Sequence, residues 1–151
     1  MKYSPHPPYE ILSNRVLTFD EIHRLRRFAR YWDLVGNSGN FALALNLIIV
    51  PGRSPFAQFS DLCDWLHAHH SSRYGISLAD LFASIFGYLV GRYPQGSEQM
   101  IAENMWQDYI RGGRRDRPEF LKPYELQSPQ QQALVGLPQR QARHSQSSKT
   151  R

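Results

Sequence analysis

Residues 18–36 read TFDEIHRLRRFARYWDLVG, a stretch that predicts an amphipathic helix with a defined beginning and end. Thr18 and Glu21 have the spacing of a capping box, in which the hydroxyl oxygen and the carboxylate each accept a hydrogen bond from the other residue's backbone N–H. Gly36 and the polar residues after it are expected to end the helix. Between these ends, apolar residues recur every three or four positions and form one face, which we expect to lie in the core: Ile22, Leu25, Phe28, Ala29, Trp32 and Val35.

The rest of the chain shows the same helical periodicity in four more segments. Asn40 can cap a short helix that runs to about Val50, although the β-branched residues in 47–50 also allow a buried strand. Three longer helices are expected to begin after Ser54-Pro55, after Ser77 and after Gly96-Ser97. Phe56, Phe59, Leu62, Cys63 and Leu66 are expected to face inward from the first of these three helices. The sequence therefore predicts an all-α fold, a compact bundle of about five helices.

The 151 residues allow one folded domain with two flanking segments. Residues 1–17 are proline-rich and predict an extended lead-in, residues 18–122 predict the helical domain, and residues 123–151 predict a disordered, basic tail rich in Gln and Ser. Residues 1–111 carry ten basic and ten acidic side chains, whereas residues 112–151 carry eight and three. The net charge of +5 therefore belongs to residues 112–151, and no nucleic-acid partner is expected for the neutral bundle.

Several classes of protein are disfavoured by what the sequence lacks. A single cysteine excludes a disulfide framework and an iron–sulfur cluster held by this chain alone. The longest apolar stretch, residues 41–50, is half the roughly 20 residues that span a bilayer, and the N-terminus has no apolar signal segment. We expect a cytoplasmic protein without a membrane partner.

Two patterns resemble catalytic or metal chemistry, and for both we favour a structural role. Asp64, His67 and His70 follow one another at three-residue spacing, but three such positions drift around a helix instead of sharing one face. Cys63 precedes His67 by one turn, yet it lies in an apolar pattern where a thiol is inert. We therefore assign no catalytic residue and no metal ligand.

Basic residues form the more informative candidates. Arg24, Arg27 and Arg30 crowd the polar face of the first helix, and this face either docks on an anionic partner or pairs with acids of the bundle itself. Arg114 and Arg115 follow a Gly-Gly helix end, where they either clamp an anionic group or belong to a C-terminal cap whose apolar residues fold back on the bundle.

A family resemblance covers about residues 5–122. The strings PPYEIL (7–12), TFDEIHRLRRFARYWDL (18–34), NSGNF (37–41), SPF (54–56), FSDLCDWL (59–66), YGISL (74–78) and GGRRDRPEFL (112–121) resemble a C-terminal region of unknown function. That region follows the radical S-adenosylmethionine (SAM) barrel in certain bacterial cobalamin-binding proteins.

The resemblance implies a non-catalytic accessory region that packs against a radical SAM barrel, in cis or in trans. The family's iron–sulfur cluster, S-adenosylmethionine and cobalamin would belong to the barrel and its companion domain, so no cofactor is expected in this chain and any enzyme activity would be the barrel's. Because residues 7–12 correspond to chain leaving the barrel, we expect a split or truncated gene or a domain that acts in trans. Partner contacts are expected at Arg24, Arg27, Arg30, Tyr31, Asn37, Arg114 and Arg115. The alternative is a small nucleic-acid-binding module that uses the first-helix arginines and the basic tail.

Overall fold

The computed structural model describes residues 2–3, 11–13, 16–70 and 75–126. Within these residues the predicted all-α bundle is confirmed, with five α-helices. They are α1 (Phe19–Val35), α2 (Ala42–Ile48), α3 (Pro55–His69), α4 (Leu78–Arg92) and α5 (Glu98–Arg111), followed by a short 3-10 helix, η1 (Glu119–Leu121). Strands β1 (Lys2–Tyr3) and β2 (Ile11–Ser13) pair antiparallel in the segment expected to be an extended lead-in, with Lys2 opposite Ser13.

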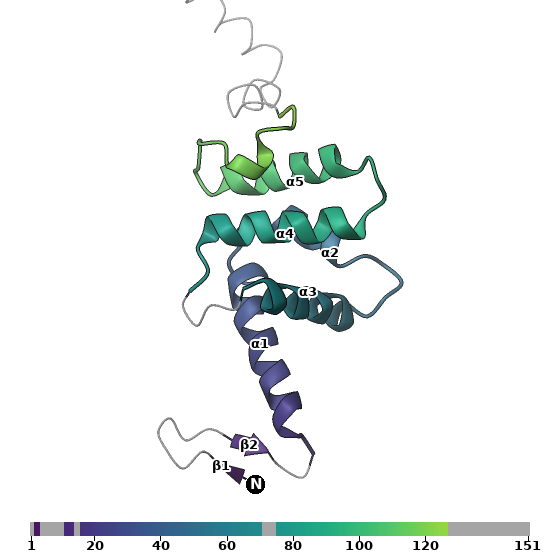
Figure 1. The fold of residues 1–151 in the computed structure, drawn as a ribbon, viewed down its shortest axis with the longest axis vertical. Coiled ribbons are helices and arrows are strands. Elements are labelled where there is room, and N and C mark those ends of the chain that lie inside the picture. Colours follow the sequence, from purple (N-terminus) through teal and green to yellow (C-terminus); the bar gives the residue numbers. More distant parts are fainter. Residues whose placement is uncertain (1, 4–10, 14–15, 71–74, 127–151) are drawn as a thin grey trace, which may run out of the picture.

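Helices α3, α4 and α5 lie one above another, and α2 packs against all three (Figure 1). Helix α1 begins beside the two strands and runs toward the stack, where it contacts α3 (Figure 1). Aromatic rings join the layers, because Phe41 lies 4.3 Å from Phe82 and Phe82 lies 5.2 Å from Tyr109, measured between ring centroids. The largest fully buried side chains come from all these layers: Phe41, Phe59, Phe82, Ile48, Leu62, Leu66, Leu81, Ile85, Leu89, Ile101, Met105 and Leu121.

Most of the predicted helix beginnings are confirmed. The capping box at Thr18 is complete, and the hydroxyls of Ser54 and Ser77 accept hydrogen bonds from backbone N–H groups of α3 and α4. The prediction for Asn40 is wrong, because α2 begins after Phe41, which has no polar side chain to cap it. The strand alternative for residues 47–50 is also wrong, since the helix continues to Ile48.

The chain after α5 folds back onto the bundle. Leu121 is fully buried, and the Phe120 and Tyr124 rings lie 5.3 and 5.5 Å from the Phe86 ring. Packed chain therefore continues past residue 122, and the backbone carbonyl of Leu126 still accepts a hydrogen bond from Arg117. The rest of the predicted tail, residues 127–151, lies outside the described residues.

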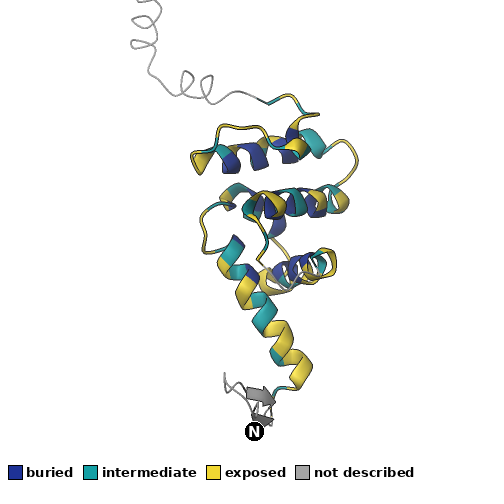
Figure 2. Ribbon diagram, turned by 60° about the vertical axis from the view of Figure 1, so that its left-hand side comes forward, coloured by how far each residue is buried: buried dark blue, intermediate teal, exposed yellow. Residues whose placement is uncertain are grey.

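The first half of α1 departs from the expected core. Of its 17 residues only Tyr31 and Val35 are buried, while Leu25 and Ala29 are exposed (Figure 2). Phe56, at the beginning of α3, was also expected to face inward and is exposed. The physical reason is the direction of α1, whose first half extends beyond the stack toward strand β2, so that helices α4 and α5 do not cover it.

Candidate docking site on helices α1 and α3

Exposed apolar side chains gather at the end of the molecule formed by α1 and the beginning of α3. Val16, Phe19, Leu25 and Phe56 are 84%, 50%, 42% and 55% exposed, and only Met100 on α5 joins them among the large apolar side chains of the described residues. Of these, Leu25 and Phe56 line one groove, and exposed apolar surface marks sites of association when its residues lie together. We call these four residues the apolar tip.

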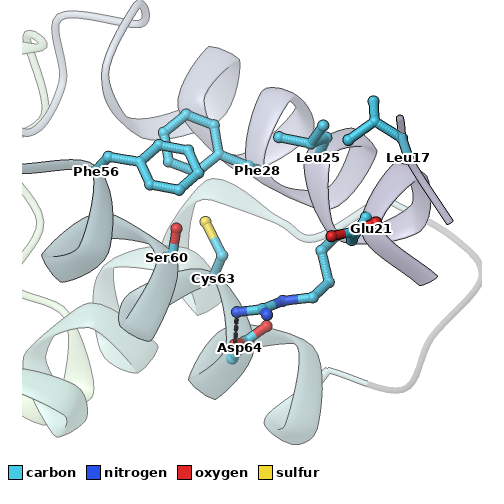
Figure 3. Close-up of a pocket in the computed structure, with 9 residues that line it drawn as sticks. Leu17, Glu21, Leu25, Phe28, Phe56, Ser60, Cys63 and Asp64 are labelled. Carbon is cyan, nitrogen blue, oxygen red and sulfur yellow. Dashed lines mark hydrogen bonds and ion pairs between the residues drawn. The ribbon is translucent and has the colours of Figure 1, made fainter. Parts of the chain in front are cut away.

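A groove of about 260 Å³ lies beside the apolar tip. Leu17, Leu25 and Phe28 line one side of it, and residues of the first half of α3 line the other (Figure 3). Phe28 and Phe56, two of its lining residues, stack with their ring centroids 4.8 Å apart. The remaining lining residues are Glu21, Arg24, Ser60, Cys63 and Asp64.

Cys63 lies at the α3 side of the groove, but its thiol is not set up as a nucleophile. The residue is only 3% exposed. Burial, reinforced by the neighbouring Asp64 carboxylate, raises the pKa of the Cys63 thiol to about 12. A nucleophilic cysteine needs the opposite surroundings, since the thiolate is the reactive form.

The basic face of α1 is partly neutralised by the bundle. Arg24 and Arg27 both reach Asp64 on α3, with nitrogen–oxygen distances of 3.3 and 3.6 Å. Both arginines share this one carboxylate, and the buried Nε of Arg27 has no hydrogen-bond partner among the described residues. Arg30 is exposed farther along the same helix. The structure thus joins Arg24 and Arg27 at Asp64, and of the two arginines only Arg24 lines the groove.

Two other residues that were predicted as partner contacts, Tyr31 and Asn37, do not lie in the groove. Tyr31 was expected among the partner contacts, yet it is 3% exposed and packs in the core, where burial raises the pKa of its hydroxyl. Asn37 is exposed after the end of α1, where its amide donates a hydrogen bond to the Asp33 carboxylate over 2.7 Å. Helical periodicity misplaces Tyr31 because α3 approaches α1 from that side.

Arg114 and Arg115 lie after α5, at the other end of the stack from the apolar tip (Figure 1). The guanidinium of Arg114 packs over the Tyr109 and Phe82 rings, 5.3 and 5.9 Å from their centroids. Arg115 is exposed. The local arrangement is that of a C-terminal cap, as one of the two sequence alternatives proposed, and it does not join these arginines with those of α1.

The structure does not bring Asp64, His67 and His70 together as one cluster. Asp64 is paired with the two arginines, whereas His70 at the end of α3 places its Nε2 2.5 Å from the Ser84 hydroxyl oxygen on α4. Within the part of the chain that the structure describes, no three His, Cys, Asp or Glu side chains gather closely enough to hold a metal ion. A search of the same residues for a helix able to cross a membrane finds none.

A family model described as a protein of unknown function, DUF4080, matches residues 1–148. The chain belongs to the DUF4080 family. Neither the curated proteins nor the solved structures contain a match to it. Because the family match spans the bundle and both flanking segments, the apolar tip and its groove are features of a DUF4080 domain.

Proposed function

We propose that this DUF4080 chain is a helical accessory domain that docks on a radical SAM barrel and performs no chemistry itself. The observation that carries the proposal is the apolar tip: four large apolar side chains are exposed, two of them (Leu25 and Phe56) line one groove, and such side chains are stabilised when a partner covers them. The resemblance of residues 5–122 to a region that follows such a barrel supports the choice of partner.

The single cysteine of the chain does not fit the iron–sulfur cluster of that enzyme class. A cluster held by a three-cysteine motif needs three thiolates, whereas Cys63 is the single cysteine of the sequence and its buried thiol has a raised pKa. The cluster is therefore assigned to the partner. In the proposal S-adenosylmethionine and cobalamin also belong to the partner, as the resemblance implies, and this chain contributes a surface that covers or braces the barrel.

The nucleic-acid alternative has less support. Two of the three candidate arginines on α1 already share Asp64, and an apolar tip does not match the charged, polar surface of a protein–nucleic acid interface. The basic tail that this alternative also needs lies mostly outside the described residues.

Co-expression tests the proposal. The full chain is co-expressed with a protein from the same genome that carries the barrel and its three-cysteine motif, and the mixture is analysed by size-exclusion chromatography with light scattering. We expect a stoichiometric complex, and two separate peaks at micromolar concentrations of both proteins would refute the proposal. A labelled RNA or DNA oligonucleotide serves as the comparison. Tight binding that weakens steeply with salt would favour the nucleic-acid module instead.

A further inference from the structure

We propose that a pocket between α3 and α4 binds the carboxylate of a small organic acid, with Arg92 and Tyr88 as its hydrogen-bond donors. The pocket has a volume of about 320 Å³, at the lower end of the roughly 300–1,000 Å³ of small-molecule sites. None of its lining residues lines the groove between α1 and α3, so this inference does not depend on the proposed function. The lining residues are Arg53, Asp61 and Trp65 from α3 and the loop before it, and Tyr88, Gly91 and Arg92 from α4.

A buried glutamine holds the arginines of this pocket in place. Gln58 has no exposed surface, and its Oε1 accepts a hydrogen bond from Nη2 of Arg92 over 3.0 Å. The same oxygen accepts a hydrogen bond from the backbone N–H of Val50, and Nε2 of Gln58 donates to the backbone carbonyls of Val50 and Arg53. Both polar atoms of Gln58 are therefore satisfied within the protein, and this network fixes the Arg92 guanidinium and the Arg53 backbone at one pocket.

Arg92 keeps donors that no protein group uses. A guanidinium has five N–H groups, and Arg92 uses one for Gln58 and one for the Tyr88 hydroxyl oxygen, which lies 2.8 Å from its Nη1. Neither partner is charged, and no carboxylate of the described residues forms an ion pair with Arg92. Every acidic residue of the chain except Glu10 is among those residues. This half-buried cation therefore has donors for an anion, and charge-assisted hydrogen bonds to arginine are among the strongest in proteins.

The Tyr88 hydroxyl supplies a second donor beside the first. Its oxygen accepts the hydrogen bond from Arg92, and its own proton has no acceptor among the described residues. A hydroxyl that accepts from a cation donates more strongly in turn, because hydrogen bonds in a chain polarise one another. A carboxylate has two oxygens and therefore offers one acceptor to each of these two adjacent donors.

The charges and rings of the lining favour a monocarboxylate with an apolar body. The six lining residues include two arginines and one aspartate, so they carry one excess positive charge, which a monoanion balances. Asp61 offsets Arg53 only weakly, since the two groups are 3.9 Å apart and more than half exposed. The Trp65 and Tyr88 rings, 5.8 Å apart between centroids, form an apolar wall for the rest of the ligand.

Phenylacetate is the probe, because it joins one carboxylate to an aromatic ring, and neutral phenylacetamide is the matched control. NMR titration of the full chain follows the backbone amides of residues 88–92. We expect phenylacetate to shift these amides in a saturable way, with an affinity at least about tenfold higher than that of phenylacetamide. Equal binding of the two compounds, or no shifts at tens of millimolar phenylacetate, would refute the inference. Tighter binding of inorganic phosphate would refute the choice of a monocarboxylate.

Four variants locate the binding site. Arg92→Met removes the charged donor, and Gly91→Leu adds a side chain where a β-carbon meets nothing within 4 Å, so both should weaken phenylacetate binding about tenfold. Asp61→Asn removes the lining carboxylate and should tighten binding several-fold, which a purely structural role of these residues does not predict. Arg115→Met, at an exposed arginine after α5, is the matched control and should leave the affinity unchanged. Unchanged binding in both Arg92→Met and Gly91→Leu, or weaker binding in Asp61→Asn, would overturn the proposal.

A carboxylate on a partner protein is the competing source of the same chemistry. The affinity of the full chain for the co-expressed barrel protein distinguishes the two sources. We expect Arg92→Met to leave this affinity unchanged and phenylacetate not to compete with the barrel protein. Loss of the complex in Arg92→Met, together with competition by phenylacetate, would show that a protein side chain occupies the pocket and would overturn the assignment to a small molecule.

Discussion

Asp108 is a buried carboxylate that organises a helix other than its own. It lies on α5 with no exposed surface, accepts hydrogen bonds from the backbone N–H groups of Leu43 and Ala44 over 3.0 and 2.8 Å, and pairs with Arg111. These N–H groups belong to the first turn of α2, which has no partner for them within its own helix. Asp108 therefore replaces the cap that Phe41 cannot provide.

Replacing this carboxylate should be costly. We expect Asp108→Ala to lower the free energy of unfolding by about 3 kcal/mol, because it removes a buried ion pair and leaves two helix N–H groups without an acceptor. Asp61→Ala is the matched control, since the exposed Asp61 lies 3.9 Å from Arg53 and such surface pairs contribute at most about 1 kcal/mol. Urea denaturation of both variants, followed by circular dichroism, measures the difference. Equal losses would contradict the capping role.

Cys63 predicts how stability depends on alkaline pH. The pKa of its thiol is about 12 in the folded protein against an ordinary value of 9.0, so folding favours the protonated form. The stability gained in this way is fully present below pH 9 and is lost as the pH rises toward 12. Cys63→Ala should flatten this part of the stability curve, which denaturation at a series of pH values measures.

The reactivity of the Cys63 thiol gives a second test of its burial. At pH 8 the folded chain should react slowly with a disulfide reagent such as dithionitrobenzoate, and the unfolded chain in denaturant should react rapidly. Rapid reaction of the folded protein would contradict the buried, protonated state of Cys63.

At the scale of elements, two glycines differ in the space that surrounds them. A β-carbon at Gly36 would lie 2.8 Å from the Trp32 ring, whereas one at Gly91, near the end of α4, would meet nothing within 4 Å. The ring of Trp32 is held in turn by Phe59, 4.9 Å away between centroids. A side chain at Gly36 therefore has no room beside Trp32, whereas a side chain at Gly91 has room.

These glycines give opposite predictions for the same substitution. Gly36→Ala should lower the melting temperature, because the Trp32 ring must move out of its contact with α3. Gly91→Ala should raise stability by about 0.5–1 kcal/mol, since alanine is the better residue within a helix. Differential scanning calorimetry of the two variants measures both effects. A stabilising Gly36→Ala would contradict the packing of Trp32.

At the scale of the whole molecule, the chain after α5 closes one end of the bundle while the apolar tip leaves the other end open. Leu121, the last residue of η1, is fully buried, and the Phe120 and Tyr124 rings pack against Phe86. The packed core is thus completed by residues that follow the last α-helix, whereas α1 carries part of its apolar face beyond the core.

Removing this closure should weaken the whole fold. Leu121→Ala deletes a fully buried side chain and should cost about 2–5 kcal/mol in a single cooperative transition. Lys122→Ala is the neighbouring control, because Lys122 is exposed and pairs with Glu119 on the surface. Thermal unfolding monitored by circular dichroism compares them. A loss confined to part of the transition would show that η1 packs as a separate unit.

Local sequence signals predicted the helices of this protein well, whereas the candidate site could be predicted only in part. Thr18, Ser54 and Ser77 lie at the caps where their hydroxyls were expected, because a cap forms among residues that are close in sequence. Arg24 and Arg27 were identified as a basic face, and their pairing with the bundle was one of two alternatives. The exposed Phe56 and the groove could not be foreseen, since periodicity shows that a face is apolar but not what covers it.

The order of residues by itself therefore determined which segments are helical, where all of the helices except α2 begin, and that the single cysteine lies in an apolar pattern. Tertiary structure alone decided that α1 leaves the stack, that Tyr31 is buried while Leu25 is exposed, and that Asp108 caps α2 from across the core. The physical reason is the separation along the chain over which each interaction acts. Helix caps and periodicity depend on neighbours within about one or two turns, whereas burial depends on segments that meet only after the chain has folded.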